Sequence, residues 1–301
     1  MTNSHIPVRW AELRPEDFRA RREAVPVVYL PLGLCEPHGN VAALGLDLIK
    51  AEYYCEEAAR RFGGIVAPAQ GYHIHECGFH APWLAEVVGE ENPLLAAIPP
   101  HVMLHLFLYL LRSFANAGFK FVVAVSGHAG GSQEDLRRAA SAFERATDLA
   151  VVVRADPEWV AGLYRGDHAG KYELSQLLAM RPELVDLSLI GPRQSGSHGR
   201  FALGHDAAEA SAEHGHAINE AIIAAIGREV SGSLPLAYKR FPQKLVDYAE
   251  VELLWSQLLA TMQEWRSLSL YPGQAPVPPS SRWHSYAQPL HVLTGHNDSN
   301  P

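Results

Sequence analysis

The stretch VVYLPLGLCEPHGNVAALGLD, residues 27–47, decides how the rest of the chain is interpreted. Apolar and β-branched residues from Val27 to Leu32 predict a buried strand, and Gly33 ends it. In open α/β sheets, ligands bind beyond the carboxyl ends of the strands. The loop that follows this strand is therefore the expected place for chemistry.

Three candidate metal ligands follow the strand. Glu36 and His38 are two residues apart, so in an extended segment both side chains leave the backbone on the same side. Pro37 between them fixes φ and stiffens that arrangement. Asp47 opens the next periodic run, 46–62, close to a helix N-terminus. Two carboxylates and an imidazole suit zinc or manganese. The structural alternatives are a strand-end ion pair and a helix-capping aspartate.

Composition sets the broad class. The chain has 301 residues, of which 48% are hydrophobic and 19% charged, which is typical of a soluble globular protein of one or two domains. A formal net charge of −8 argues against a general nucleic-acid binder. We expect a cytoplasmic protein without a membrane span, because the N-terminus lacks a signal-peptide pattern and no apolar run reaches about 18 residues. The three cysteines lack metal-knuckle spacing and are interpreted as reduced thiols.

Strands and helices alternate along the chain. The predicted strands are 27–33, 65–70, 121–127 and 149–155. The predicted helices are 8–24, 46–62, 100–117, one that begins at Ser132 with Asp135 in a capping box, 167–180, 206–230 and 244–266. Such alternation predicts an α/β fold with a central, mainly parallel sheet. We expect a catalytic domain at 1–235 and a helical extension with a Pro/Ser/His-rich tail at 236–301, packed on that domain or on a neighbouring subunit.

Two later segments extend the candidate site. SGHAGGS, residues 126–132, follows the most apolar strand, and its glycines allow the backbone to approach a bound group. It is not a phosphate loop, because the GK[ST] element is missing. DHAGKYELS, residues 167–175, places His168 before a helix and Glu173 in its first turns. Without further information, Glu173 could equally be an acid that complements the helix dipole.

Together these motifs resemble the creatininase (creatinine amidohydrolase) family. The matching segments are EPHG at 36–39 with Asp47, SGHAGG at 126–131 and HAGKYELS at 168–175. The resemblance implies a three-layer α/β/α sandwich with a two-metal site at the strand ends. It also implies a homo-oligomer, commonly a hexamer in this family, and hydrolysis of cyclic or linear amides.

The resemblance assigns a ligand to each position. Glu36 and His128 would hold one divalent metal ion, His38 and Glu173 the other, and Asp47 would bridge both. Zinc, manganese or both are expected, and iron fits the same ligands. In two-metal sites the ions together lower the pKa of a shared water.

The proton shuttle of the family maps onto His168, whose ordinary pKa near 6.5 suits proton transfer. A purely structural role for this histidine is the alternative.

The substrate side departs from the family pattern. Creatininase takes a metal carboxylate from the position of Gly130, so Glu173 should replace it, as in other branches of the family. Tyr164 stands where creatininase has a gating tryptophan, and the long segment 71–93 replaces another family motif. The predicted substrate-binding residues are His75, Glu76, His80, Gly130 and Tyr164.

The expected function is a dinuclear-metal hydrolase that opens a polar cyclic small molecule by metal-hydroxide attack on a carbonyl, as a cyclic amidohydrolase would. The first alternative is hydrolysis of a cyclic polyol ketone such as 3-dehydro-scyllo-inosose, with cleavage of a ring C–C bond. A peptide-processing member of the family and a non-catalytic binding or assembly protein are further alternatives. The long 71–93 segment favours a covered pocket over the open groove that peptide processing needs.

Overall fold

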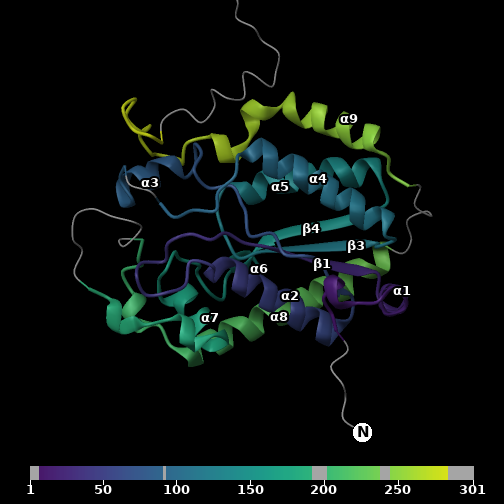
Figure 1. The fold of residues 1–301 in the computed structure, drawn as a ribbon, viewed down its shortest axis with the longest axis horizontal. Helices are drawn as coiled ribbons and strands as arrows, with labels where there is room; N and C mark the ends of the chain where they lie inside the picture. The colour runs from purple at the N-terminus through teal and green to yellow at the C-terminus, as the bar shows by residue number, and fades with distance from the viewer. Residues whose placement is uncertain (1–6, 91–92, 192–201, 238–244, 284–301) are drawn as a thin grey trace, which may run out of the picture.

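The computed structural model describes residues 7–90, 93–191, 202–237 and 245–283. Within them, four strands form one sheet in the order β2-β1-β3-β4, with every neighbouring pair parallel. The strands are β1 (Val27–Leu32), β2 (Ile65–Val66), β3 (Phe121–Ser126) and β4 (Ala150–Ala155). Figure 1 shows helices on both faces of this sheet, so the predicted three-layer α/β/α architecture is confirmed.

Nine α-helices surround the sheet in the described part of the chain. They are α1 (Pro15–Ala24), α2 (Leu46–Phe62), α3 (Ala81–Val87), α4 (Pro100–Asn116), α5 (Ser132–Ala146), α6 (Asp156–Trp159), α7 (Lys171–Met180), α8 (Ala212–Ala237) and α9 (Tyr248–Leu259). None of these helices combines the length and the apolar character that crossing a bilayer requires.

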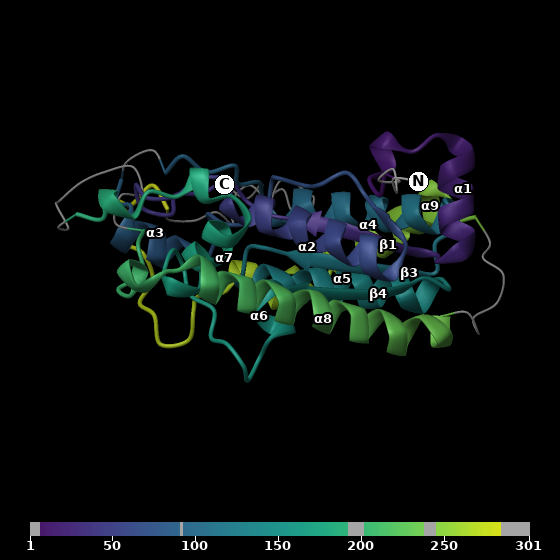
Figure 2. The ribbon, with the colours of Figure 1, turned by 90° about the horizontal axis from the view of Figure 1, so that it is seen from below.

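Side chains alternate across β1 and thereby divide the core in two. Val28 and Leu30 are buried with α4 and α5, whereas Val27 and Tyr29 are buried with α2 and α8. Figure 2, seen from below, shows α8 running along the length of the sheet, on the face that it shares with α2. A strand that is buried on both faces has a continuous run of apolar residues. This run is the reason that the sequence predicts β1 and β3.

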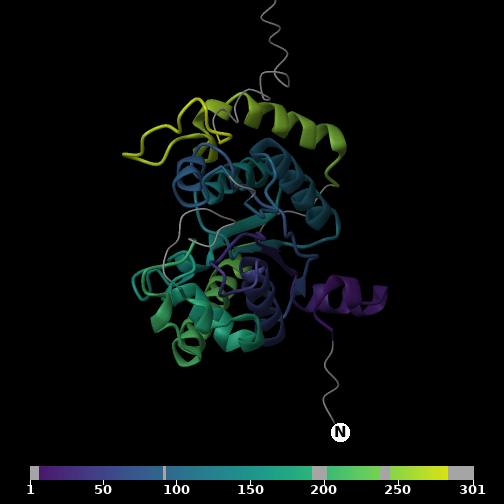
Figure 3. The same ribbon diagram turned by 60° about the vertical axis from the view of Figure 1, so that its left-hand side comes forward.

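A further helix covers the α4–α5 layer. Apolar residues of α9, including Val251 and Leu254, share one core with α4 and α5. Figure 3 shows α9 outermost on that side of the molecule. The chain then returns to α3, where the buried Trp283 donates from Nε1 to Gly89 O at 2.7 Å. The remainder of the predicted tail lies outside the described residues.

Several predicted elements are shorter or broken. The segment 8–24 forms a 3₁₀ turn at Trp10–Glu12 and then α1, because Pro15 restarts the helix. The segment 206–230 is likewise a 3₁₀ turn followed by α8, which continues past the predicted end to Ala237. The helix α9 ends at Leu259, before two 3₁₀ turns. The predicted strand 65–70 is regular only at its first two residues.

The predicted capping box at Ser132 is wrong. Gly131 is the N-cap of α5, and no side chain caps that end. The carboxylate of Asp135 instead accepts hydrogen bonds from the backbone N–H groups of Arg266 and Ser267, each at 2.7 Å. It therefore ties the C-terminal segment to α5, a long-range role that local sequence spacing cannot reveal.

The N-terminus of α2 lies against the carboxyl edge of the sheet. A Cβ atom on Gly127 would lie 2.0 Å from the backbone oxygen of Asp47, and one on Gly33 would lie 2.4 Å from Leu48 Cα. No other residue type fits at either position. These two glycines bring the first turn of α2 to the strand ends, where the candidate ligands lie.

We predict that Gly127→Ala lowers the free energy of unfolding by about 1–3 kcal/mol or more, because the added methyl group must displace backbone. Denaturant titration measures this. The control is Gly232→Ala on the exposed side of α8, where a Cβ meets open space and alanine stabilises a helix by about 1 kcal/mol. Equal stability of Gly127→Ala and the parent protein would contradict the close approach.

Candidate metal centre

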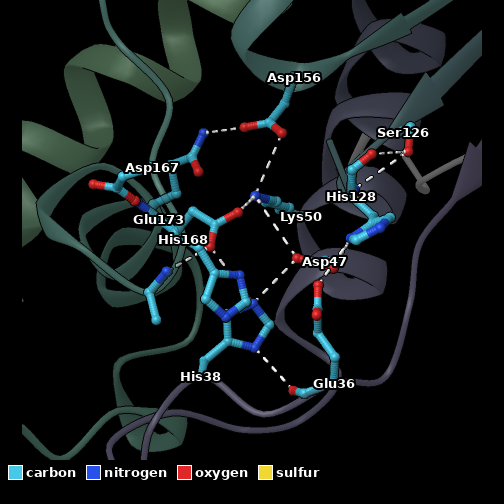
Figure 4. Close-up of polar contacts among 12 residues, drawn as sticks. Glu36, His38, Asp47, Lys50, Ser126, His128, Asp156, Asp167, His168 and Glu173 are labelled. Carbon is cyan, nitrogen blue, oxygen red and sulfur yellow. Dashed lines mark hydrogen bonds and ion pairs between the residues drawn. The ribbon is translucent and has the colours of Figure 1, made fainter. Parts of the chain in front are cut away.

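The predicted metal ligands come together at the carboxyl edge of the sheet (Figure 4). Leu32, Ser126 and Ala155 end their strands in register, so the loops that follow begin side by side. The loop after β1 carries Glu36 and His38, the loop after β3 carries His128, and the helices α2 and α7 supply Asp47 and Glu173. All five side chains are buried.

One group of ligand atoms surrounds His38. Its Nε2 lies 3.3 Å from Asp47 Oδ1 and 3.5 Å from Glu173 Oε2. The other ring nitrogen, Nδ1, lies 3.0 Å from the backbone oxygen of Glu36. A carbonyl oxygen only accepts, so Nδ1 carries the proton in the neutral ring and the lone pair on Nε2 faces the two carboxylates.

A second group surrounds His128. Its Nδ1 lies 2.8 Å from Glu36 Oε1 and 3.4 Å from Asp47 Oδ2. The two oxygens of Asp47 therefore face two different imidazoles, one from each strand-end loop. This is the arrangement expected of a carboxylate that bridges two ions.

The residues present fit a metal centre. Several of the buried atoms that face one another have no hydrogen-bond partner among the described residues, although buried polar atoms are normally paired. These atoms are Glu36 Oε2, His38 Nε2, Asp47 Oδ1 and Asp47 Oδ2. Imidazole nitrogen and carboxylate oxygen are the donor set that zinc and manganese take. These residues form groups that could hold a metal ion.

Two residues of the centre were missed in the sequence. Lys50, one turn after Asp47 in α2, is fully buried, and its Nζ lies 2.6 Å from Glu173 Oε1 and 3.4 Å from Asp156 Oδ1. Asp156 follows β4 directly and also accepts from Gln176 Nε2 at 2.9 Å. A lysine on the apolar face of an amphipathic helix, and an acid at a strand end, were the available signals.

Burial and charge act in opposite directions on the ligands. Burial alone would raise the pKa of Glu36, but the imidazoles of His128 and His75 outweigh it and hold that pKa well below its ordinary value. Burial would lower the pKa values of His38 and His128, yet the carboxylates beside them raise these to about 9 and about 10. Burial raises the pKa of Asp156 to about 6, against the pull of Lys50.

His168 lies against His38, next to the predicted ligands. Its ring stacks on that of His38, with centroids 4.9 Å apart, and meets the ring of Trp83 edge to face at 5.1 Å. Its Nε2 lies 3.0 Å from the backbone oxygen of Pro37. In the neutral ring, Nε2 therefore carries the proton and Nδ1 carries a free lone pair.

The predicted substrate-binding residues are divided. His75 and His80 stack on one another, and both rings approach His128, with centroids 5.3 Å away. Gly130 has its backbone directly under the ring of His80.

The other two predicted substrate residues have different surroundings. Glu76 is half-buried, and burial raises its pKa while the charge of Arg282 lowers it. Tyr164 packs on the α2–α8 core and meets the ring of His214. Among the described residues, neither Glu76 nor Tyr164 makes a hydrogen bond, ion pair or ring contact with the five predicted ligands.

The buried ammonium of Lys50 leads to a stability prediction. Lys50→Met should lower the free energy of unfolding by about 3–5 kcal/mol, because it leaves Asp156 and Glu173 buried without their cation. Urea titration of the metal-free protein measures this. The control Lys171→Met breaks an ion pair with Glu209 at the surface and should cost less than about 1 kcal/mol. Similar losses in both variants would show that Lys50 adds nothing specific.

Proton release should accompany metal binding. The pKa values of His38 and His128 are raised to about 9 and about 10, so both rings are protonated at pH 7, whereas only the neutral ring binds a metal. About two protons per chain should leave at pH 7, and affinity should rise with pH as these pKa values are approached. Calorimetric titration in buffers of different ionisation enthalpy counts the protons. Binding without proton release would contradict the assignment.

Comparison with known proteins identifies the family to which the chain is similar. Residues 11–230 match the family model for creatininase, described as creatinine amidohydrolase. A creatinine amidohydrolase of Pseudomonas putida is 26% identical over 199 residues, which is 60% of this chain and 74% of the relative. A creatinine amidohydrolase crystal structure aligns with 76% of this chain and 98% of its own, with a TM-score of 0.64 and 22% identity.

Two further solved structures show the same fold. A manganese form of creatininase also gives a TM-score of 0.64, at 22% identity, over 76% of this chain and 99% of its own. A protein from Bacteroides fragilis, described as a putative creatinine amidohydrolase, gives 0.59 at 20% identity, over 80% of this chain and 98% of its own. With the family model covering most of its length, the chain belongs to the creatininase family of metal-dependent hydrolases.

Proposed function

We propose that this chain is a two-metal hydrolase that opens a polar cyclic small molecule at a carbonyl carbon, with a cyclic amide as the expected substrate class. The observation that carries the proposal is Asp47, whose two oxygens face His38 Nε2 and His128 Nδ1. The name of the P. putida relative supports amide hydrolysis.

Bound metals would supply an activated water and positive charge for a developing oxyanion. The protein holds the ligands in place. One side of the centre consists of Glu36 and His128, and the other of His38 and Glu173. Lys50 fixes the carboxylate of Glu173 by donating a hydrogen bond to its Oε1. The backbone N–H of Ala169 donates to Glu173 Oε2 at 2.9 Å and orients that oxygen as well.

His168 is placed to move the proton. Its Nε2–H is held by Pro37 O, so Nδ1 can take a proton from the attacking water and return it to the leaving nitrogen. Stacking on His38 and the edge contact with Trp83 keep the ring in one orientation. Because His168 is only partly buried, it can contact both solvent and substrate.

The substrate class is tested by a ring-opening screen of lactams, cyclic ureas and inosose derivatives with the metal-replete protein. Turnover of lactams or cyclic ureas supports the proposal. Opening of an inosose without amide turnover would instead assign the C–C bond chemistry. Fewer than one divalent ion per chain in a metal-replete preparation would contradict the metal centre and favour a binding or assembly protein.

The roles of the residues are tested by two variants. We predict that Asp47→Asn loses both bound metals and all turnover, because both ions depend on that carboxylate. His168→Ala should keep both metals and lose about 100- to 10,000-fold in kcat, the usual contribution of general acid–base catalysis. Elemental analysis and steady-state kinetics measure the two effects. Loss of metal in His168→Ala would show that it is a ligand and not the proton carrier.

A further inference from the structure

A third imidazole lies against the Glu36 side of the centre. His75 comes from the loop between β2 and α3, and its Nε2 lies 2.8 Å from Glu36 Oε2. The side chain is buried, with only 2% of its surface exposed. Ligand atoms of Glu36, His75 and His128 all lie within 4.8 Å of one another, which is a spacing that a single cation can span.

The contact between His75 and Glu36 is close without being a well-formed hydrogen bond. Glu36 Oε2 has no hydrogen-bond partner among the described residues, although His75 Nε2 is 2.8 Å away. The oxygen therefore does not lie where an N–H on that nitrogen would point. His75 Nδ1 is also buried without a partner in the described chain. A carboxylate oxygen and an imidazole nitrogen this close together are a pair of ligands that one ion can share.

The loop holds His75 in this position. The backbone oxygen of His75 accepts from Cys77 N at 2.8 Å, and its ring stacks on His80 with centroids 4.6 Å apart at 15°. His80 in turn fills the space over Gly130, where a Cβ atom would lie 2.4 Å from His80 Nε2. A side chain at position 130 would therefore press on the ring of His80.

We propose that His75 is a metal ligand, which joins Glu36, His128 and one oxygen of Asp47 around the same ion. This inference rests on the metal centre of the proposed function and extends it. One side of the centre then has two nitrogen donors, and the other has one nitrogen from His38 with oxygens from Asp47 and Glu173. The nitrogen-richer side should select zinc, and the oxygen-richer side should also accept manganese.

The experiment compares His75→Gln and His75→Ala with the parent protein. The affinity for Zn²⁺ is measured by chelator competition, and cobalt-substituted samples are compared by visible absorption. We expect both variants to lose at least about 10- to 100-fold in affinity for one ion of the two, as large as the loss from disturbing an outer partner of a ligand. The cobalt spectrum should change in the same variants. His105→Gln is the matched control, because its ring pairs with Glu252 at the surface and lies outside the ligand groups.

The outcomes separate the alternatives. If His75 only donated a hydrogen bond to Glu36, the amide of His75→Gln would preserve metal affinity and His75→Ala alone would lose it, which overturns the inference. Unchanged affinity in both variants overturns it as well and leaves a substrate contact as the role of His75. Both results require a parent protein that binds two ions. A parent that binds none would instead contradict the proposed function itself. Circular dichroism of each variant confirms that it is folded.

Discussion

The buried ammonium group of Lys50 is the interaction on which the candidate centre depends. Among the described residues it is the only lysine or arginine that is buried, and carboxylates of Asp47, Asp156 and Glu173 lie within 3.9 Å of its Nζ. Burial opposes the charged form, but Asp156 and Glu173 outweigh it and raise the pKa of Lys50 above its ordinary value. The positive charge at this point opposes the effect of burial on Asp156, and its hydrogen bond fixes the direction in which Glu173 points.

One turn of α2 supplies both the positive charge of Lys50 and the carboxylate of Asp47, which faces both sides of the centre. Asp47 and Lys50 are three residues apart in α2, so they lie on the same face of the helix. Asp47 also lies in the first turn, where the helix dipole favours a negative charge. The arrangement requires the helix to meet the strand ends closely, and Gly33 and Gly127 make this approach sterically allowed. The fold and the site are therefore linked through these two glycines, because only a residue without a side chain allows the helix to come this close.

Much of this was predictable from the sequence, for local reasons. The bounds of α2 and the course of β1 and β3 follow from apolar periodicity, and the ligand motifs follow strand ends. Lys50 and Asp156 were missed because each looks ordinary in its own segment, and only the parallel register brings α2 and the end of β4 together. Asp135 was misassigned for the same reason, since its partners are more than 130 positions away.

The two sides of the candidate centre differ in the side chains that face them. A side chain at residue 130 would be strained, because the φ of +158° is one that L-residues rarely adopt and the Cβ would meet the ring of His80. On the His38 side, the carboxylate comes from Glu173 on α7. Lys50 and the backbone N–H of Ala169 donate hydrogen bonds to it and hold it in place. On the Glu36 side, the imidazole of His75 approaches both Glu36 and His128. With His75 as the proposed ligand, the Glu36 side has more nitrogen donors than the His38 side, and donor type is what a protein can vary to choose between divalent ions.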